Sequence, residues 1–377
     1  MKQIKNLLRL LVAMIVLVGI FAACEGPEGP AGPKGDKGDT GDPGEPGPGS
    51  VVNWEGFMEG IKCADCHNPD YDTTYFVWAR KYQWILSKHA IGGDFERNSA
   101  SCAACHTTEG YLQDQLGRTV TSNVHASPPG CFACHSPHSR ADFSLRTTDP
   151  VTVASAVAGV DDLVFDYGKG NLCVSCHKTR SLNPEPDPAS SDPITITSSR
   201  WYPHYGVQGQ MLAGTGGFQF AGESYTNSFH TNSQTIKDEG CVICHMADPN
   251  AGNGIGGGHT MNIRYEGTHG DEQELVTGCT VTGCHGTPFE IDYDGVQTET
   301  HELLDSLHTL LVDRGWIDPS SGLVNASSSN PLVITPGWLS GAIFNYYFIE
   351  HDLSFGTHNT KYAQKLLEDS IEKLNSN

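Results

Sequence analysis

Apolar residues recur at helical spacing near the C-terminus of this 377-residue chain. Three segments carry them at intervals of three and four residues, one beginning at Glu302 and the others spanning 337–351 and 361–374, which predicts amphipathic helices. The leucines of the first segment share one side of its helix: Leu303, Leu304, Leu307, Leu310 and Leu311. His301 and His308 then fall on the outer face of that helix.

The middle of the chain, residues 51–300, shows little regular periodicity. One helix is predicted over residues 75–89, where the aromatic positions share one side. Residues 181–199, rich in Pro, Ser and Thr, predict a surface loop. Only 38% of all residues are hydrophobic, and the chain has 43 glycines and 21 prolines. A large core made of side chains alone is therefore not expected.

The N-terminus has the pattern of an export signal, with three basic residues before an uncharged run of 14 residues, 10–23. The small residues before Cys24 resemble a bacterial lipobox, although Phe21 stands where leucine is usual. By this resemblance residues 1–23 are a lipoprotein signal peptide, Cys24 is the lipid anchor, and Glu25 favours the outer membrane. A simple cleaved signal or a membrane anchor is the alternative.

The segment after the cysteine repeats with a strict period of three. Eight glycines open Gly-X-Y triplets between residues 26 and 49, and prolines fill many of the other positions. Only glycine fits the crowded axis of a collagen triple helix, so residues 24–50 predict a collagen-like stalk that could join three chains. The alternative is a single extended spacer of roughly 70 Å, at about 3.1 Å per residue.

One motif dominates the remaining sequence. Five copies of C-x-x-C-H are followed by a sixth copy with four residues between its cysteines. The cysteines are Cys63, Cys66, Cys102, Cys105, Cys131, Cys134, Cys173, Cys176, Cys241, Cys244, Cys279 and Cys284. The histidines that follow them are His67, His106, His135, His177, His245 and His285.

The motif has a chemical rationale. Two cysteines bond covalently to one porphyrin, and the adjacent histidine then binds its iron from below. Zinc sites and disulfides also use paired cysteines, but neither demands a histidine directly after every second cysteine. The sequence therefore predicts six covalently attached haems c. They use twelve of the 13 cysteines and leave Cys24 for the lipid.

The chain resembles the multihaem c-type cytochromes of extracellular and outer-membrane electron transfer, and distantly the pentahaem nitrite reductases. The run from Cys131 to His138 is similar to the C-x-x-C-H-x-P-H of outer-membrane electron conduits. Gly356-Thr357-His358-Asn359 is similar to the G-x-H-N of the nitrite reductase relatives. The likeness covers residues 53–374, is specific for multihaem cytochromes, and is less specific for any one member.

The resemblance also suggests which histidines bind the second face of each iron. The predicted distal ligands are His89, His125, His138, His230, His259 and His358. His204 is the reserve, because its counterpart in relatives can instead face a substrate pocket, here with Arg200. His351 is expected at a helix end, and His269 has no assigned role. Methionine is scarce after the signal, which favours histidine and low reduction potentials.

The expected fold is a loop-rich, mainly α cytochrome whose haems supply the core. Residues 51–300 form the hexahaem domain, and residues 301–377 add the C-terminal helices of the same domain. The uneven spacing of the motifs argues against a repeat solenoid.

The predicted function is electron transfer at the cell surface, along stacked bis-histidine haems. Partners would be other redox proteins or extracellular acceptors, and self-assembly into a trimer or a filament is open. The net charge of −21 speaks against nucleic acid. The alternative is an enzyme that reduces nitrite, hydroxylamine or a sulfur oxyanion at one open haem.

Overall fold

The computed structural model describes residues 63–70, 72–92, 94–140, 142–248, 255–267 and 269–377. The described residues all belong to one compact unit, Glu55–Asn377. The predicted signal peptide, the lipidated Cys24 and the collagen-like stalk lie outside the described residues. Within those residues, no helix has the length and apolarity that crossing a bilayer would need.

Five very short helices overlap the C-x-x-C-H motifs. They are α2 (Ala64–His67), α5 (Ala103–His106), α7 (Cys131–Cys134), α9 (Gly170–Val174) and α13 (Val242–His245). Residues three apart lie on the same side of a helix, so one turn brings both cysteines of a motif together. The sixth motif, residues 279–285, forms turns instead of a helix, because its two additional residues break this spacing.

The six motifs nevertheless close in the same way. In each one, the backbone N–H of the histidine donates to the carbonyl of the first cysteine, at 2.8–3.2 Å. The sixth motif keeps this bond, from His285 to the carbonyl of Cys279 at 3.0 Å, across a longer loop. The extra residues are therefore absorbed as a bulge, and the cysteines and the histidine keep a common arrangement.

Outside the motifs, the helices before residue 296 are also short. They are α3 (Val77–Ile85), α4 (Lys88–Ile91), α6 (Thr108–Gln115), α8 (Pro137–Arg140), α10 (Gln208–Ala213), α11 (Phe229–Asn232), α12 (Gln234–Glu239), η1 (Gly258–Thr260) and η2 (Tyr293–Gly295). The single helix predicted over residues 75–89 is in fact two, α3 and α4. Ser87 separates them, because its extended backbone lets its hydroxyl accept from the N–H of Ala90 and begin a new helix.

The strands form four small antiparallel pairs: β1 (Val151–Val153) with β2 (Leu163–Phe165), β3 (Ile194–Ile196) with β8 (Leu332–Ile334), β4 (Arg264–Glu266) with β5 (Glu272–Glu274), and β6 (Ile317–Asp318) with β7 (Leu323–Val324). Strand β3 falls in the predicted surface loop of residues 181–199. Ile194 lies opposite Ile334, and Ile196 is buried, so the end of that loop is part of the fold.

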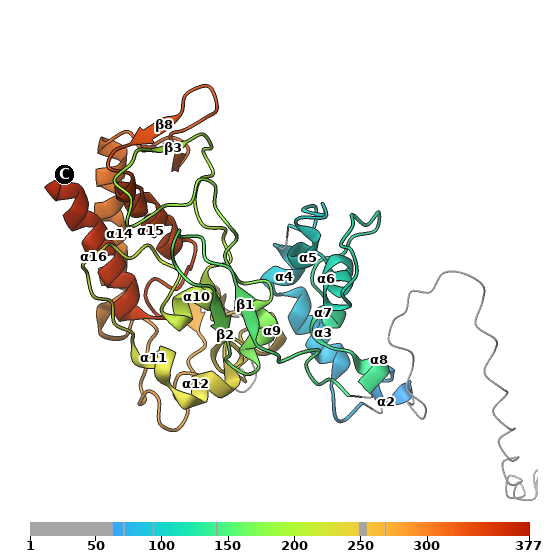
Figure 1. The fold of residues 1–377 in the computed structure, drawn as a ribbon. Helices are drawn as coiled ribbons and strands as arrows, with labels where there is room; N and C mark the ends of the chain where they lie inside the picture. Colours follow the sequence, from blue (N-terminus) through green and yellow to red (C-terminus); the bar gives the residue numbers. More distant parts are fainter. Residues whose placement is uncertain (1–62, 71, 93, 141, 249–254, 268) are drawn as a thin grey trace, which may run out of the picture. The chain divides into compact units, whose positions relative to one another are not determined.

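The C-terminal part contains the longest helices, α14 (Val296–Asp313), α15 (Gly341–Glu350) and α16 (Thr360–Ser376), with η3 (Gly337–Ser340) leading into α15. The three helices pack side by side, as Figure 1 shows in orange and red. Leu304, Leu307 and Leu311 are buried in their core, as the sequence pattern predicts, although α14 begins six residues before Glu302. The described part of the chain is thus loop-rich and mainly α-helical.

Candidate functional site: six histidine pairs

Each motif histidine lies opposite one other histidine. The distance between the two ring centres is 5.9–6.3 Å in all six pairs. We number the sites by their motifs along the chain: site 1, His67–His138; site 2, His106–His204; site 3, His135–His259; site 4, His177–His89; site 5, His245–His358; site 6, His285–His230. The partners come from segments that are distant in the sequence.

This spacing fits one metal ion between two imidazoles. A metal–histidine bond of about 2 Å and the roughly 1 Å from the ligating nitrogen to its ring centre, taken on both sides of one ion, give about 6 Å. The six pairs agree with this value although their ring planes differ. The planes lie 36–44° apart in sites 1, 3 and 5, and 77–79° apart in sites 2, 4 and 6. The donor set therefore suits the iron of a covalently attached haem at every motif.

Five of the six histidines expected on the distal side take part in these pairs. The exception is His125, which is exposed and whose backbone N–H donates to the side chain of Asn123 at 2.9 Å. His204, expected only as a reserve, lies opposite His106 instead. The sequence shows enough histidines for six pairs. It does not show whether His125 or His204 faces His106, because His204 is almost 100 residues away in the sequence and reaches His106 only through the fold.

The remaining histidines have other neighbours. The ring centre of His301 lies 3.9 Å from that of Phe355, and the ring centre of His308 lies 5.4 Å from that of Tyr346. His351 is buried, and its ring hydrogen-bonds to the carbonyl of Pro203 at 3.1 Å. His269 is exposed.

The motifs touch one another through their cysteines. All twelve motif cysteines are free of disulfides. Sγ of Cys176 lies 3.9 Å from the carbonyl oxygen of Ala104, and in this way motif 4 meets motif 2. A second contact, between the side chains of Cys173 and Cys241, joins motif 4 to motif 5. Motifs 5 and 6 meet through the side chains of Cys244 and Cys279.

Glycines allow this close approach. A Cβ placed on Gly170, at the start of α9 before motif 4, would lie 2.9 Å from the Cα of Gly240, which directly precedes motif 5. A Cβ on Gly278, just before motif 6, would lie 2.1 Å from the carbonyl oxygen of Ile243. Neither position has room for a side chain, so glycine is required where neighbouring motifs press backbone against backbone.

Burial lowers the pKa of seven of the twelve paired histidines, which favours the neutral form that binds a metal. Burial lowers the pKa of His89, His245 and His259 to about 4 in each case. His358 differs, because the Asp352 carboxylate outweighs the effect of burial and raises its pKa above the ordinary value.

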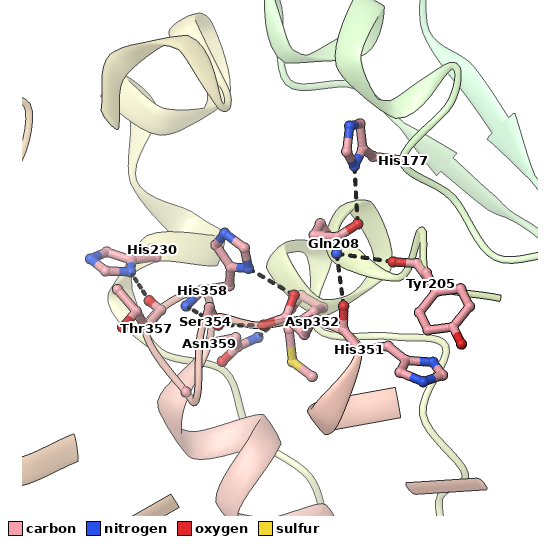
Figure 2. A network of polar contacts seen from close by, with 12 residues as sticks. His177, Tyr205, Gln208, His230, His351, Asp352, Ser354, Thr357, His358 and Asn359 are labelled. Carbon is pink, nitrogen blue, oxygen red and sulfur yellow. Dashed lines mark hydrogen bonds and ion pairs between the residues drawn. The ribbon is translucent and has the colours of Figure 1, made fainter. Parts of the chain in front are cut away.

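The second ring nitrogen of several ligands is fixed by a hydrogen bond, which leaves the first nitrogen to face its partner. Nδ1 of His230 lies 2.7 Å from the carbonyl of Thr357, and Nδ1 of His177 lies 3.2 Å from the amide oxygen of Gln208 (Figure 2). In site 3, Nδ1 of His135 lies 3.2 Å from the carbonyl of Ser144. These contacts orient the rings toward each other.

The turn after α15, residues 351–359, serves three sites at once. It contributes His358 to site 5 and the carbonyl of Thr357 to site 6. The carbonyl of His351 also accepts from Gln208, the neighbour of site 4, at 3.0 Å (Figure 2). Asn359, fully buried, donates to the side chain of Thr231 at 2.9 Å and ties the turn to α11. This turn therefore supports several ligands as well as supplying one.

Comparisons with known proteins point in the same direction. No family model matches the chain. It is 24% identical to the C-type polyheme cytochrome OmcC of Geobacter sulfurreducens over 346 residues, 74% of this chain and 43% of that one. It is 23% identical to the C-type polyheme cytochrome OmcB of the same species over 366 residues, 80% of this chain and 46% of that one. The chain thus spans less than half the length of these curated relatives.

Among solved structures, the chain is similar to the outer cell wall cytochrome OcwA. The TM-score is 0.46, with 20% sequence identity over 78% of this chain and 50% of the other.

Proposed function

We propose that this chain, a multihaem c-type cytochrome, carries electrons through six haems c, each held by one motif and one histidine pair. The motifs and the polyhaem relatives support the family. The observation that carries the proposal is the common spacing of the six pairs, with a second histidine opposite every motif histidine.

Ligation on both faces favours a carrier over an enzyme. A haem iron with histidine on both sides exchanges single electrons and has no position left for a substrate. The alternative, reduction of nitrite, hydroxylamine or a sulfur oxyanion, needed His204 free beside a pocket. Its ring instead lies 6.1 Å from that of His106, at the separation that the other pairs have. The enzymatic reading therefore loses its candidate open site.

Contacts between the motifs suggest the order of the sites. Cysteine contacts join motif 4 to motifs 2 and 5, and motif 5 to motif 6. Cys134 of motif 3 and Cys176 of motif 4 pack on the same small apolar cluster. His138 of site 1 lies 5.4 Å from Phe132, which is inside motif 3. The chain would therefore hold sites 1, 3, 4, 5 and 6 in series, with site 2 beside site 4.

We place this carrier at the cell surface, anchored in the outer membrane through Cys24 and raised by the Gly-X-Y segment. Its partners would be other redox proteins or extracellular acceptors. Assembly into a trimer through residues 24–50, or into a filament, is compatible with the sequence.

Labelling with radioactive palmitate tests the anchor. The protein should incorporate the label, and the Cys24→Ala variant should not. Light scattering with and without residues 24–50 tests the trimer.

Two variants test the ligand assignment. Electron paramagnetic resonance of the oxidised protein should show low-spin iron throughout, and mass spectrometry should count six haems. His204→Ala should create a high-spin signal equal to one haem, because site 2 loses a ligand. His125→Ala is the matched control and should leave every signal unchanged. High-spin iron in the unaltered protein, or in His125→Ala alone, would contradict the proposal.

The ring planes provide an independent check. The angle between the two imidazole planes governs the anisotropy of a low-spin ferric signal. Sites 1, 3 and 5, with planes 36–44° apart, should give the rhombic type of spectrum, and sites 2, 4 and 6, at 77–79°, the strongly anisotropic type. Integrated intensities should therefore divide about equally between the two types. A spectrum dominated by one type would not fit these pairs.

A further inference from the structure

Asp352 is a buried carboxylate in direct contact with a ligand. Its side chain is 1% exposed, and its Oδ1 lies 2.8 Å from Nδ1 of His358 in site 5 (Figure 2). The other oxygen accepts from the hydroxyl of Ser354, which in turn accepts from the backbone N–H of His358 at 3.2 Å. A buried carboxylate is costly unless it is paired, and this one is paired with the histidine.

The contacts found at the neighbouring sites are neutral. At site 4, Nδ1 of His177 faces the amide oxygen of Gln208, and Nδ1 of His89 faces the sulfur of Met261 at 3.0 Å. At site 6, Nδ1 of His230 faces the carbonyl of Thr357. Site 5 differs from these two neighbours in that a carboxylate faces its paired histidine.

The charge matters because of what it does to the ligand. A carboxylate that accepts the Nδ1 proton makes an imidazole a stronger electron donor at its other nitrogen. A stronger donor stabilises the oxidised metal more than the reduced one, and hydrogen bonding around ligands is one way in which a protein sets a haem potential. Burial keeps the carboxylate away from solvent, so its field is only weakly screened.

We propose that Asp352 sets the reduction potential of site 5 below those of its two neighbours, sites 4 and 6. This rests on the proposed electron-carrying function. Site 5 lies between sites 4 and 6 in the contact order above. An electron that moves between those two sites must therefore pass through a haem of lower reduction potential, where its free energy is higher. Asp352 is then a tuning residue, which acts on the iron only through His358.

The test is a pair of opposite charge changes at neighbouring sites. Asp352→Asn keeps the shape and an oxygen that accepts from His358 but removes the charge. Gln208→Glu puts a carboxylate beside His177 at site 4. In a redox titration followed by visible absorption, each haem contributes a share of the absorbance change on reduction. In Asp352→Asn, the share of one haem should move to higher potential. Gln208→Glu should move one share to lower potential. Both variants should keep six low-spin haems.

The outcomes separate this inference from the proposed function. Six low-spin haems with an unchanged titration in Asp352→Asn would overturn the tuning role and leave the electron carrier intact. An equal shift of several haems would also overturn it, because it would mean that Asp352 only supports the turn. If Asp352→Asn does not load all its haems, Gln208→Glu decides: an unchanged titration there speaks against carboxylate tuning.

Discussion

The C-terminal helices and the motif-bearing segments gain their order in different ways. Helices α14, α15 and α16 have 18, 10 and 17 residues and bury Leu307, Phe344 and Phe348 completely. The helices at the motifs have four or five residues, too few to be stable alone, and large side chains such as Trp78 and Tyr82 stay exposed beside them. Side-chain packing holds the first region. Residues 63–148 bury only a few apolar side chains, so we expect their order to depend on what their cysteines and histidines bind.

The largest expected effect follows directly from this difference. A chain produced without haem attachment should lose the arrangement of residues 63–148, because few apolar side chains are buried there: Ala103, Tyr111, Leu112 and Ala133. The helices α14–α16 should retain more of their structure. Limited proteolysis with mass spectrometry would show early cleavage within residues 63–148 and later cleavage after residue 296. Uniform cleavage along the chain would remove the distinction between the two regions.

A core substitution in the C-terminal region should act in the opposite way. Phe344→Ala removes a fully buried ring and should cost about 3–5 kcal/mol of unfolding free energy. The absorption spectrum of the haems should stay unchanged in the folded protein. Val333→Ala, on an exposed position of β8, is the control and should change stability by less than about 0.5 kcal/mol. Denaturant melts measure both variants, and equal costs would count against a side-chain core here.

A smaller effect is expected where two motifs meet. Gly278→Ala places a methyl group 2.1 Å from the carbonyl of Ile243, so motifs 5 and 6 must move apart, at a cost of about 1–3 kcal/mol. Gly286→Ala, with no heavy atom within 4 Å of its new methyl, is the matched control. Thermal melts should separate the two variants. Equal melting temperatures would mean that the motifs do not need this close contact.

The two regions also differ in how far the sequence could predict them. The leucine spacing of α14 located its buried face, because a helix core depends on local periodicity. The motifs predicted six attachment points for the same reason, since cysteines and histidine are adjacent in sequence. The distal side of site 2 depends on how a loop around His204 folds against a remote motif, and nothing local distinguishes it from His125. Asp352 could not be found either, because its role lies in a contact formed by a turn.

The smallest effect is expected at site 3, where a positive charge lies near a ligand. Arg80 lies 3.4 Å from Nδ1 of His259, an arrangement opposite in sign to Asp352 at site 5. A cation withdraws electron density from the imidazole, so Arg80→Gln should lower the potential of one haem. Arg80 is exposed, and solvent screens its charge, so the shift should be smaller than that of Asp352→Asn. The same redox titration at low and high salt measures it. The shift should shrink as salt rises, and a shift that is independent of salt would mean that Arg80 acts through packing and not through its charge.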